Sequence, residues 1–318
     1  MQEMSHRHSR DLDIFYQEHK DRCTNCGKAF SDGMCAHLGY LVNQVPAVLC
    51  DDCAPLLVET VVRYHWMKDE YNKPAPTEKL WRYMDLAKLI HLLSTSKLYF
   101  ASADSFEDIF EGAKGVIERK ERWDNFYLDF FREAIKTIPG ATPDMLEPEQ
   151  IEKDAHRLLT ELDASGENER KHVFISCWHS NKYESEAMWK LYSANTQNAV
   201  AIQTTAEHLY QALDRDPYIK IGKVKYIDYN KRFSSFNGAY WYKRKSFEHE
   251  REVRAVLSNY NTKARGILVP INIHMLIDKI YISPYAPKWF EEVVNSVMEK
   301  YEVMSPVVCS DMTQKPFY

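Results

Sequence analysis

Short apolar runs bounded by polar residues recur through the second half of the chain. They are rich in Val, Ile and Tyr, a composition that favours strands. These runs cover residues 172–179, 198–205, 222–229, 266–273 and 278–283. Between them, apolar residues return at helical spacing. The helices that this spacing predicts cover residues 184–195, 205–214 and 286–300.

The segment before these runs also alternates between the two patterns. A strand is predicted at 80–83, an amphipathic helix at 86–93 and a second strand at 97–102. Two helices are predicted next. The first is charged and aromatic and covers 116–136, and the second is polar and ends at about residue 164. Because they interrupt the strand pattern, residues 116–170 are interpreted as a helical insertion.

This order of elements predicts an α+β fold with a split, mostly antiparallel sheet and helices packed at one end. A dinucleotide-binding fold of the GxGxxG type is excluded, because the chain has only 10 glycines and no glycine-rich loop. At 318 residues, the chain is long enough for one large and one small domain. The predicted division is a small module at 1–70, a proline-containing linker at 71–79 and the α+β domain at 80–318.

The stretch KSFEHEREVRAV, residues 245–256, fits two conformations. As a helix it places Glu250 and Arg254 four residues apart, which is a favourable pair. As a strand it aligns three carboxylates on one face together with Arg254, and such a cluster requires a compensating cation. The strand-rich surroundings favour a strand over 252–257.

Composition and charge narrow the choice of function. Hydrophobic residues make up 45% and aromatic residues 13% of the chain, as expected of a packed globular protein. The net charge of -5 argues against general attraction to polyanions. Two basic stretches with aromatic residues, 218–232 and 242–245, fit either solvated strands and loops or a groove for a single nucleic-acid strand.

The sequence predicts a soluble, cytoplasmic protein with no membrane association. The N-terminal residues lack the apolar core of a signal peptide, and no apolar run approaches the roughly 20 residues that span a bilayer. The seven cysteines are therefore expected in a reducing compartment, which argues against a disulfide framework.

Four of these cysteines form two CxxC pairs, Cys23 with Cys26 and Cys50 with Cys53. Gly27 follows the first pair, where a tight turn can aim backbone amides at the thiolates. Two such pairs predict a tetrahedral four-cysteine site, which zinc favours over harder metals. Four protein ligands leave no open position, so the zinc is interpreted as structural.

The remaining cysteines leave alternatives open. Cys35 and His37 lie between the two pairs and could replace a ligand. The second pair opens what the pattern predicts to be a helix through about residue 68. Cys177 and Cys309 are interpreted as buried apolar side chains. A thioredoxin-like redox pair is the rival to zinc, but it would consist of a single pair in a βαβ unit.

Five blocks after residue 79 carry a family resemblance. In chain order they are LWRYMD, KLYFASADSFEDIFEG, FISCWH, AMWKLYS and KRKSFEHEREVRA. Through these blocks most of 80–290 resembles the bacterial domain-of-unknown-function 2971 family, which is regarded as ADP-ribosyltransferase-like. The resemblance implies an ADP-ribosyltransferase-like fold and a transferase that uses NAD as a substrate. In bacteria such domains often serve as toxins or in phage defence. The zinc module lies outside the shared region.

The resemblance also implies which residues carry the reaction. Cleavage of the nicotinamide–ribose bond passes through an oxocarbenium-like state that a nearby carboxylate stabilises. Glu252 is the expected catalytic carboxylate, Glu250 would orient the acceptor or the ribose, and Arg82 matches the first-strand position. The residues expected to bind NAD are Arg82, Ser176, Trp189, Tyr192 and Arg254.

Each of these residues also has a purely structural interpretation. Arg82 could pair with Asp85, Ser176 could be a satisfied core hydroxyl, and Trp189 could pack in the core. Glu248 is interpreted as a solvated charge. A second acidic cluster could line the same cleft, bind a metal or form a solvated turn. Its members are Asp104, Glu107, Asp108 and Glu111.

Two functions from different classes follow. The first is NAD-dependent ADP-ribosyl transfer to a nucleic acid or a protein, with an antitoxin or regulatory partner left open. The alternative is a non-catalytic, zinc-dependent nucleic-acid-binding or regulatory protein that contacts its partner through 218–245, with Lys243 and Arg244 as phosphate contacts. A metal-dependent nuclease is weaker, because no ligand triad stands out.

Overall fold

The computed structural model of the protein describes residues 21–31, 34–65, 71–138, 140–193, 196–216, 218–235 and 238–318. The chain divides into two compact units. One comprises Met1–Glu70 with Leu213–Lys220, and the other comprises Tyr71–Ala212 with Ile221–Tyr318.

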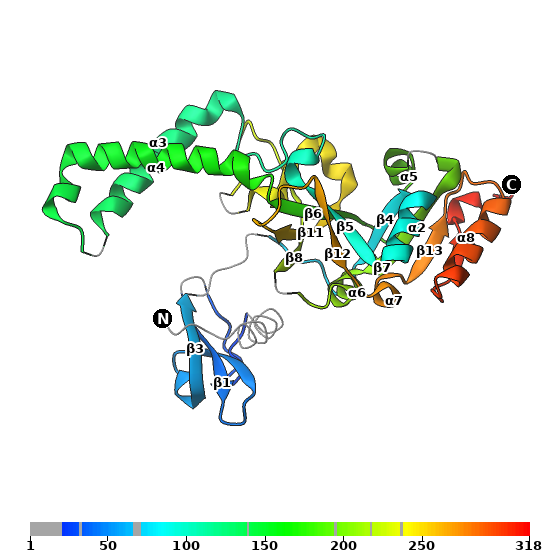
Figure 1. The fold of residues 1–318 in the computed structure, drawn as a ribbon, viewed down its shortest axis with the longest axis horizontal. Helices are drawn as coiled ribbons and strands as arrows, with labels where there is room; N and C mark the ends of the chain where they lie inside the picture. Colours follow the sequence, from blue (N-terminus) through cyan, green and yellow to red (C-terminus); the bar gives the residue numbers. More distant parts are fainter. Residues whose placement is uncertain are drawn as a thin grey trace. The chain divides into compact units, whose positions relative to one another are not determined.

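The small unit contains a three-stranded antiparallel sheet in the order β2-β1-β3 (Figure 1). Its strands are β1 (Cys35–Leu41), β2 (Pro46–Cys50) and β3 (Leu57–His65). The apolar core gathers Ala36, Leu38 and Val48 together with Cys23 and Cys50. The unit is small, so its core is small as well, and additional cross-links are needed for stability.

The helix predicted after Cys53 is wrong within the described residues. A single 3-10 turn, η1 (Ala54–Leu56), gives way directly to strand β3. Pro55 is compatible with the first turn of a helix, but the following LVETVV run is rich in β-branched residues that favour a strand. Pairing with β1 then fixes this run in the sheet. Residues 66–68 of the predicted helix lie outside the described residues.

The large unit is built on a nine-stranded sheet. Its strands are β4 (Lys79–Asp85), β5 (Lys97–Ser102), β6 (Val173–Ser180), β7 (Ala199–Thr205), β8 (Ile219–Lys223), β11 (Glu252–Ser258), β12 (Gly266–Pro270), β13 (Lys279–Ile282) and β14 (Val307–Cys309). The pairs β11–β6, β12–β5, β13–β7, β4–β6, β4–β7 and β5–β6 are antiparallel, and β13 pairs with β14 in parallel. The predicted α+β fold with a mostly antiparallel sheet is therefore confirmed.

The sheet divides at β6. Along one edge, β6 pairs with β11 over its full length, from Val173 to His179. Along the other edge it pairs with β5 near Phe174 and with β4 near His179. The middle of β6 therefore faces a gap between β4 and β5. A short parallel pair of β9 (Lys225–Ile227) and β10 (Tyr242–Arg244) forms a separate two-stranded sheet.

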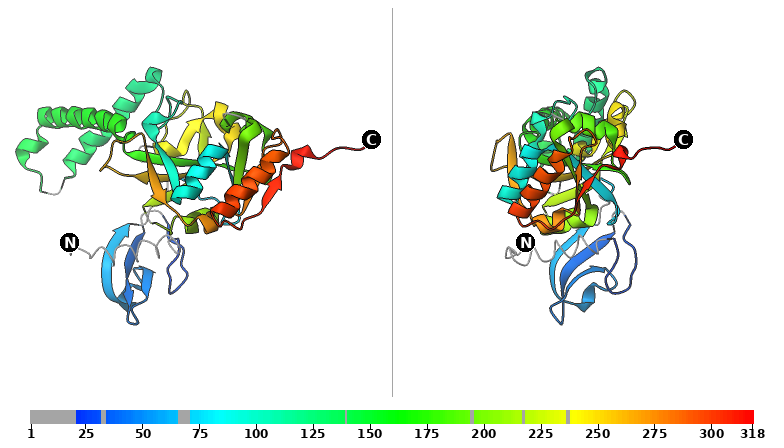
Figure 2. Two further views of the ribbon diagram at one scale, coloured as in Figure 1. Left: turned by 45° about the vertical axis from the view of Figure 1, so that its right-hand side comes forward. Right: turned by 90° about the vertical axis from the view of Figure 1, so that its right-hand side faces the viewer.

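Helices complete the large unit, and α2 and α8 lie along the same face of its sheet (Figure 2). The helices are α2 (Leu86–Thr95), α3 (Lys120–Lys136), α4 (Pro148–Glu169), α5 (Glu186–Tyr192), α6 (Ala206–Ala212), α7 (Ile273–Leu276) and α8 (Trp289–Lys300). Helix α2 begins where the Asp85 carboxylate accepts a hydrogen bond from the Lys88 amide at 2.9 Å. None of the helices in the described ranges is both long and apolar enough to cross a bilayer.

Helices α3 and α4 lie side by side and extend beyond the sheet (Figures 1 and 2). They share an apolar cluster of their own that contains Leu128, Ile135 and Leu159. Outside it, Arg132 donates two hydrogen bonds to the Glu152 carboxylate, at 2.8 and 2.6 Å. This hairpin occupies most of the predicted insertion at 116–170.

The segment 71–79 packs on the large unit. Tyr71 stacks on Trp241 with the ring centroids 4.3 Å apart, and Asn72 forms an isolated β-bridge with Lys223. Strand β4 begins at Lys79, the last residue of this segment.

The charged stretch at 245–256 forms the predicted strand in its second half and a short 3-10 turn, not the alternative α-helix, in its first half. Residues Lys245–Glu250 form a 3-10 turn, η7, and strand β11 begins at Glu252. Arg251 joins them in the left-handed region with a φ of 42°. A non-glycine residue in this region is strained, and such residues concentrate at functional sites.

Candidate active site

A cavity of about 710 Å³ lies at the gap where the sheet divides. Its lining comes from β4, α2, β5 and β6, together with α5 and the start of β11. Residues with polar or aromatic side chains that line it include Arg82, Tyr99, Trp178, His179, Tyr192, Glu250 and Glu252. A cavity of this size is typical of small-molecule and cofactor sites.

Arg82 on β4 connects the strands around this cavity. Its Nη1 donates a hydrogen bond to Ser176 Oγ on β6, and its Nη2 donates to the Tyr99 carbonyl on β5 at 3.3 Å. The guanidinium lies over the Trp178 ring, 5.5 Å from its centroid. The side chain is half-buried. Burial lowers the pKa of Arg82.

Arg82 is not paired with an acid in the described part of the chain. The alternative partner, Asp85, instead accepts from the Lys88 amide and lies 3.1 Å from Lys88 Nζ. Ser176 and the Tyr99 carbonyl are neutral, so they leave the positive charge of Arg82 uncompensated. A half-buried cation with this surrounding is suited to an anionic ligand.

Glu250 and Glu252 reach one cation from two different elements. The Glu250 carboxylate ends η7, that of Glu252 begins β11, and both accept hydrogen bonds from Lys243 Nζ. The Lys243 Nζ to Glu252 Oε2 distance is 3.3 Å. Tyr192 on α5 also donates its hydroxyl to Glu250 Oε1 at 2.9 Å. Lys243 is therefore the compensating cation that the carboxylate pair requires.

Glu252 is held ionised despite its burial. Burial acts to raise the pKa of its carboxyl, but the charges of Arg254 and Lys243 outweigh burial and lower the pKa to about 2. Burial acts to lower the pKa of Lys243, and the two carboxylates raise it above its ordinary value. The site thus keeps a permanent negative charge at the edge of the cavity.

Arg254 is hydrogen-bonded to Glu252 and does not line the cavity. Its guanidinium is fully buried and donates to Glu252 Oε1 at 2.8 Å and to the Glu111 carboxylate at 2.5 and 2.8 Å. It also donates to the Tyr240 carbonyl at 2.6 Å. Burial raises the pKa of Glu111. The expected contact of Arg254 with NAD therefore does not fit, whereas its pairing with a carboxylate does.

The remaining predicted residues separate into two groups. Ser176 is buried beside Arg82, and Tyr192 lines the cavity with almost half of its side chain exposed. Trp189 is fully buried, packs edge-on against Tyr83, and donates its indole N–H to Glu184 at 3.0 Å. Trp189 therefore occupies the core, and no part of it lines the cavity.

His179 is a candidate that the sequence did not single out. It is buried at the edge of the cavity, and its Nδ1 lies 2.5 Å from the Glu250 carbonyl oxygen. Its Nε2 has no hydrogen-bond partner among the described residues. Burial lowers the pKa of His179, so the ring is neutral near pH 7. The motif FISCWH contained the signal, but a lone histidine on a strand is also compatible with a core position.

Lys243 and Arg244, the two predicted phosphate contacts, form ion pairs around this site. Lys243 is only 8% exposed and bonded to both carboxylates, and Arg244 pairs with Asp108 at 2.6 Å. Lys243 is therefore not accessible as a phosphate contact, and Arg244 already has a carboxylate partner. Among the described residues, none of the acidic cluster at 104–111 belongs to a group close enough to hold a metal.

A second cavity of about 870 Å³ lies at the ends of β4, β6 and β11. Charged and aromatic residues that line it include Lys79, Lys182, Tyr183, Lys223, Tyr226, Arg251 and Glu252. Lys223 pairs with Glu78 at 2.6 Å. In the described ranges, the other three cations form no ion pair, and all three are exposed. Glu252 lines both cavities.

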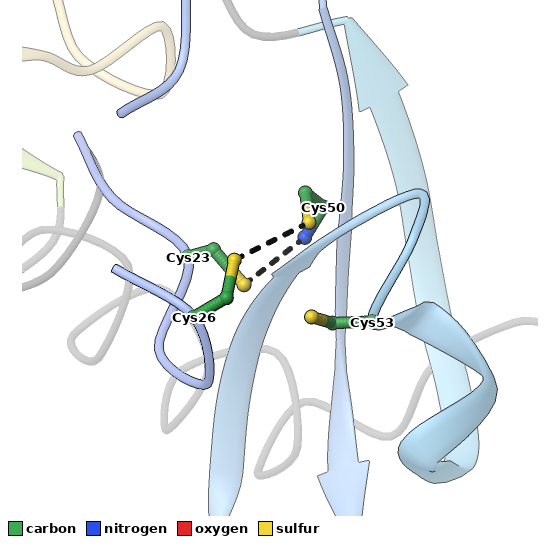
Figure 3. Close-up of side chains that lie close together, drawn as sticks. All are labelled: Cys23, Cys26, Cys50 and Cys53. Carbon is green, nitrogen blue, oxygen red and sulfur yellow. Dashed lines mark hydrogen bonds between the residues drawn. The ribbon is translucent and has the colours of Figure 1, made fainter. Parts of the chain in front are cut away.

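In the small unit, the four predicted cysteine ligands lie together (Figure 3). The sulfurs of Cys26 and Cys50 are 3.8 Å apart. A tetrahedral zinc–thiolate site with Zn–S bonds of about 2.3 Å places its sulfurs roughly 3.8 Å apart, so the arrangement fits this metal. Asn25 donates a hydrogen bond to Cys53 Sγ at 3.4 Å, and Gly27 adopts a φ of 70° at the turn.

The thiols of the cluster differ in acidity. Burial acts to raise the pKa of Cys23, but hydrogen bonds from the Cys26, Cys50 and Asn25 amides lower it to about 7. Burial raises the pKa of Cys50 to about 11, and the neighbouring sulfurs contribute. The Cys50 thiol is therefore protonated near neutral pH unless a bound cation stabilises its thiolate.

The two cysteines interpreted as buried differ from that expectation. Cys309 is exposed, and Cys177 is half-buried and lines the first cavity. Burial raises the pKa of the Cys177 thiol. A thiol with this shift is protonated and a poor nucleophile.

Comparisons with known proteins place few constraints on the chain. No family model matches it, so the predicted membership of the domain-of-unknown-function 2971 family has no support, and no curated protein matches it. One similar solved structure is Thermus sp. 2.9 DarT in complex with ADP-ribosylated ssDNA, at 12% identity and a TM-score of 0.34, covering 78% of this chain and 99% of that chain. Another is Thermus sp. 2.9 DarT in complex with NAD+, at 11% identity and a TM-score of 0.33, covering 76% and 98%. Similarity at this level leaves the function to be argued from the site.

Proposed function

We propose that this protein is an NAD-dependent ADP-ribosyltransferase. The observation that carries the proposal is the arrangement around the first cavity. Arg82 and Ser176 are hydrogen-bonded across the gap in the sheet, and the Glu252 carboxylate lines the same cavity. The cation and the carboxylate have separate partners, so neither neutralises the other.

The carboxylate suits the bond that must break. When the bond between the ribose C1′ and the nicotinamide nitrogen breaks, the electron pair leaves with nicotinamide and positive charge develops on the ribose. An ionised Glu252 at the cavity edge stabilises that charge and accepts a hydrogen bond from a ribose hydroxyl. Because the pKa of Glu252 is about 2, the carboxylate needs no deprotonation before the reaction.

Other residues that line the cavity suit the rest of NAD. The uncompensated charge of Arg82 favours the diphosphate, and Ser176 fixes the direction of its guanidinium. The rings of Tyr99 and Tyr192 supply apolar surface for a base or the nicotinamide. The free Nε2 of His179 offers a further hydrogen-bonding position.

The acceptor would enter through the second cavity, because it shares Glu252 with the first. The acceptor's nucleophile attacks C1′ with its lone pair and loses its proton to Glu250, which lines the first cavity and shares Lys243 with Glu252. The three unpaired cations, Lys79, Lys182 and Arg251, favour an acceptor that carries phosphates, and the exposed ring of Tyr183 suits a stacked base. A nucleic-acid acceptor is therefore preferred to a protein. Modification of such a target is how a toxin or phage-defence effector acts.

We also infer that Cys23, Cys26, Cys50 and Cys53 bind one structural zinc ion. The support is the sulfur spacing and the donor set, which leaves no open coordination position. The ion would supply stability that the small core of this unit lacks.

The test is to incubate the protein with NAD, alone and with single-stranded DNA, RNA or a cell lysate, and to analyse the products by mass spectrometry. The expected products are free nicotinamide and an acceptor that is heavier by one ADP-ribosyl group. Absence of both products under every condition contradicts the proposal and favours the non-catalytic, nucleic-acid-binding alternative. ADP-ribosyl groups found on lysate proteins alone would contradict the preference for a nucleic-acid acceptor but agree with the proposed transferase activity.

A further inference from the structure

A second group of metal-ligand side chains lies in the small unit, apart from the four clustered cysteines. It consists of Cys35 and His37 on β1 and Asp51 directly after β2. One ligand atom from each lies within 4.8 Å of the other two. His37 Nε2 and Asp51 Oδ1 are 2.9 Å apart.

The strand register explains why these three residues meet. Ala36 pairs with Cys50 in the antiparallel β1–β2 ladder, so Asp51 follows at the level of Cys35. Side chains alternate along a strand, so Cys35 and His37 share the face opposite to buried Ala36. The two ligand groups therefore use opposite faces of the same strands, and Cys35 and His37 are not substitutes for the clustered cysteines.

We propose that Cys35, His37 and Asp51 bind a second zinc ion, with one coordination position left for water or an exchangeable ligand. One thiolate, one neutral imidazole and one carboxylate form a sulfur, nitrogen and oxygen donor set that suits zinc better than magnesium or calcium. The thiolate and carboxylate together balance the charge of the ion. Three protein ligands with an open position differ from the closed four-sulfur site beside it.

The His37–Asp51 distance is compatible with this ion after a small adjustment. Zinc–nitrogen and zinc–oxygen bonds of about 2.0 Å place the two atoms roughly 3.3 Å apart in a tetrahedral site. The His37 Nε2 to Asp51 Oδ1 distance of 2.9 Å would need to open by about 0.4 Å from this value. The Asp51 side chain is more than half exposed and that of His37 is 12% exposed, so the carboxylate can move into place.

Metal content of the full-length protein tests the proposal. The protein is equilibrated with zinc and passed over a desalting column, and its zinc content is then measured by inductively coupled plasma mass spectrometry. We expect two zinc ions per chain in the wild type and one in Asp51→Asn and His37→Ala. Asp52→Asn is the matched control, because the neighbouring Asp52 pairs with Lys28 at 3.3 Å and lies outside the group. This variant is expected to retain two.

Cobalt substitution provides a second readout that does not depend on the amount bound. A second cobalt ion should add sulfur-to-metal absorption that disappears in Cys35→Ser, while the four-sulfur spectrum remains and shows that the unit is folded. One zinc ion in the wild type, or two in both Asp51→Asn and His37→Ala, would overturn the proposal. So would a second-ion spectrum that Cys35→Ser leaves unchanged.

Discussion

At the scale of single residues, the site depends on charges that are buried together. Arg254 is fully buried between Glu252 and Glu111, and Lys243 is bonded to Glu252 and Glu250. A buried ion pair adds little stability when intact, but removal of one partner leaves the other charge uncompensated. The network therefore acts mainly to hold Glu252 in one position and in one protonation state.

Glu111→Gln tests this positioning role. The change removes the charge that faces Arg254 without changing the shape of the side chain. We expect the free energy of unfolding to fall by about 3 kcal/mol, measured by urea titration of tryptophan fluorescence. Glu107→Gln, at an exposed position of the same loop, should change it by less than about 0.5 kcal/mol. Equal effects of the two variants would show that Arg254 does not need Glu111.

The pH dependence of NAD cleavage tests the protonation state of Glu252. Its pKa is depressed to about 2 in the folded protein, against an ordinary value of about 4.3 for an exposed glutamate. Its stabilising contribution is therefore fully present above about pH 4.3 and is lost as the pH falls toward about 2. We expect no loss of nicotinamide release centred near pH 4.3. Such a loss in protein that circular dichroism shows to be folded would mean that the carboxylate is not held ionised.

At the scale of elements, regular strands and helices were predictable, whereas their junctions were not. β6, β7 and β13 follow from β-branched runs, and α2 follows from its apolar spacing and the Asp85 cap. The prediction of a helix after Cys53 was wrong. The periodicity of Leu57–His65 is ambiguous, and pairing with β1 makes this run a strand.

Residues 245–256 show most clearly what sequence patterns cannot predict. Neither period describes residues 245–256, because Arg251 in the left-handed region switches the chain from η7 to β11. Glu250 and Glu252 were predictable as a pair, but their cation was not. Nothing in the sequence indicated that Lys243 is buried, and only the fold brings it into ion pairs with both carboxylates. The burial of Arg254 with Glu111 joins residues 143 positions apart, which no local pattern reveals.

Arg82→Lys tests the role of the gap between β4 and β5. Lysine keeps the charge but cannot donate to both Ser176 and the Tyr99 carbonyl in the same geometry. We expect the KM for NAD to rise by about tenfold or more, measured by nicotinamide release, because the diphosphate loses an oriented partner. Arg157→Lys, at an exposed position on α4, is the control and should leave the KM unchanged. An unchanged KM in Arg82→Lys would remove Arg82 from the binding site.

At the scale of the whole molecule, the chain combines two units with different sources of stability. The large unit is held by an extended sheet with several apolar clusters. Among its described residues, the small unit has one small apolar core, which includes Cys23 and Cys50 of the cysteine cluster. Its cohesion is therefore expected to depend on metal, since structural zinc binding and folding are coupled in units of this size.

Chelation tests this difference. After removal of zinc from the full chain, hydrogen exchange should accelerate strongly in β1 and β2 and stay unchanged in β6, β7 and β13. The two sets of strands serve as internal controls for each other in one mass-spectrometric experiment. Retained protection in β1 and β2 without zinc would show that the small unit folds without metal.

The assignment of Glu252 as the catalytic carboxylate for NAD cleavage is tested by the initial rate of nicotinamide release. The rate is compared between the wild type, Glu252→Gln and Glu248→Gln. Glutamine preserves the shape of the side chain at both positions, and Glu248 is an exposed carboxylate on the 3-10 turn that precedes Glu252. We expect measurable release by the wild type and by Glu248→Gln, and a loss of about 100-fold or more in Glu252→Gln. Wild-type rates in Glu252→Gln would contradict the assignment of the catalytic carboxylate, and no release by the wild type would contradict the proposed reaction itself.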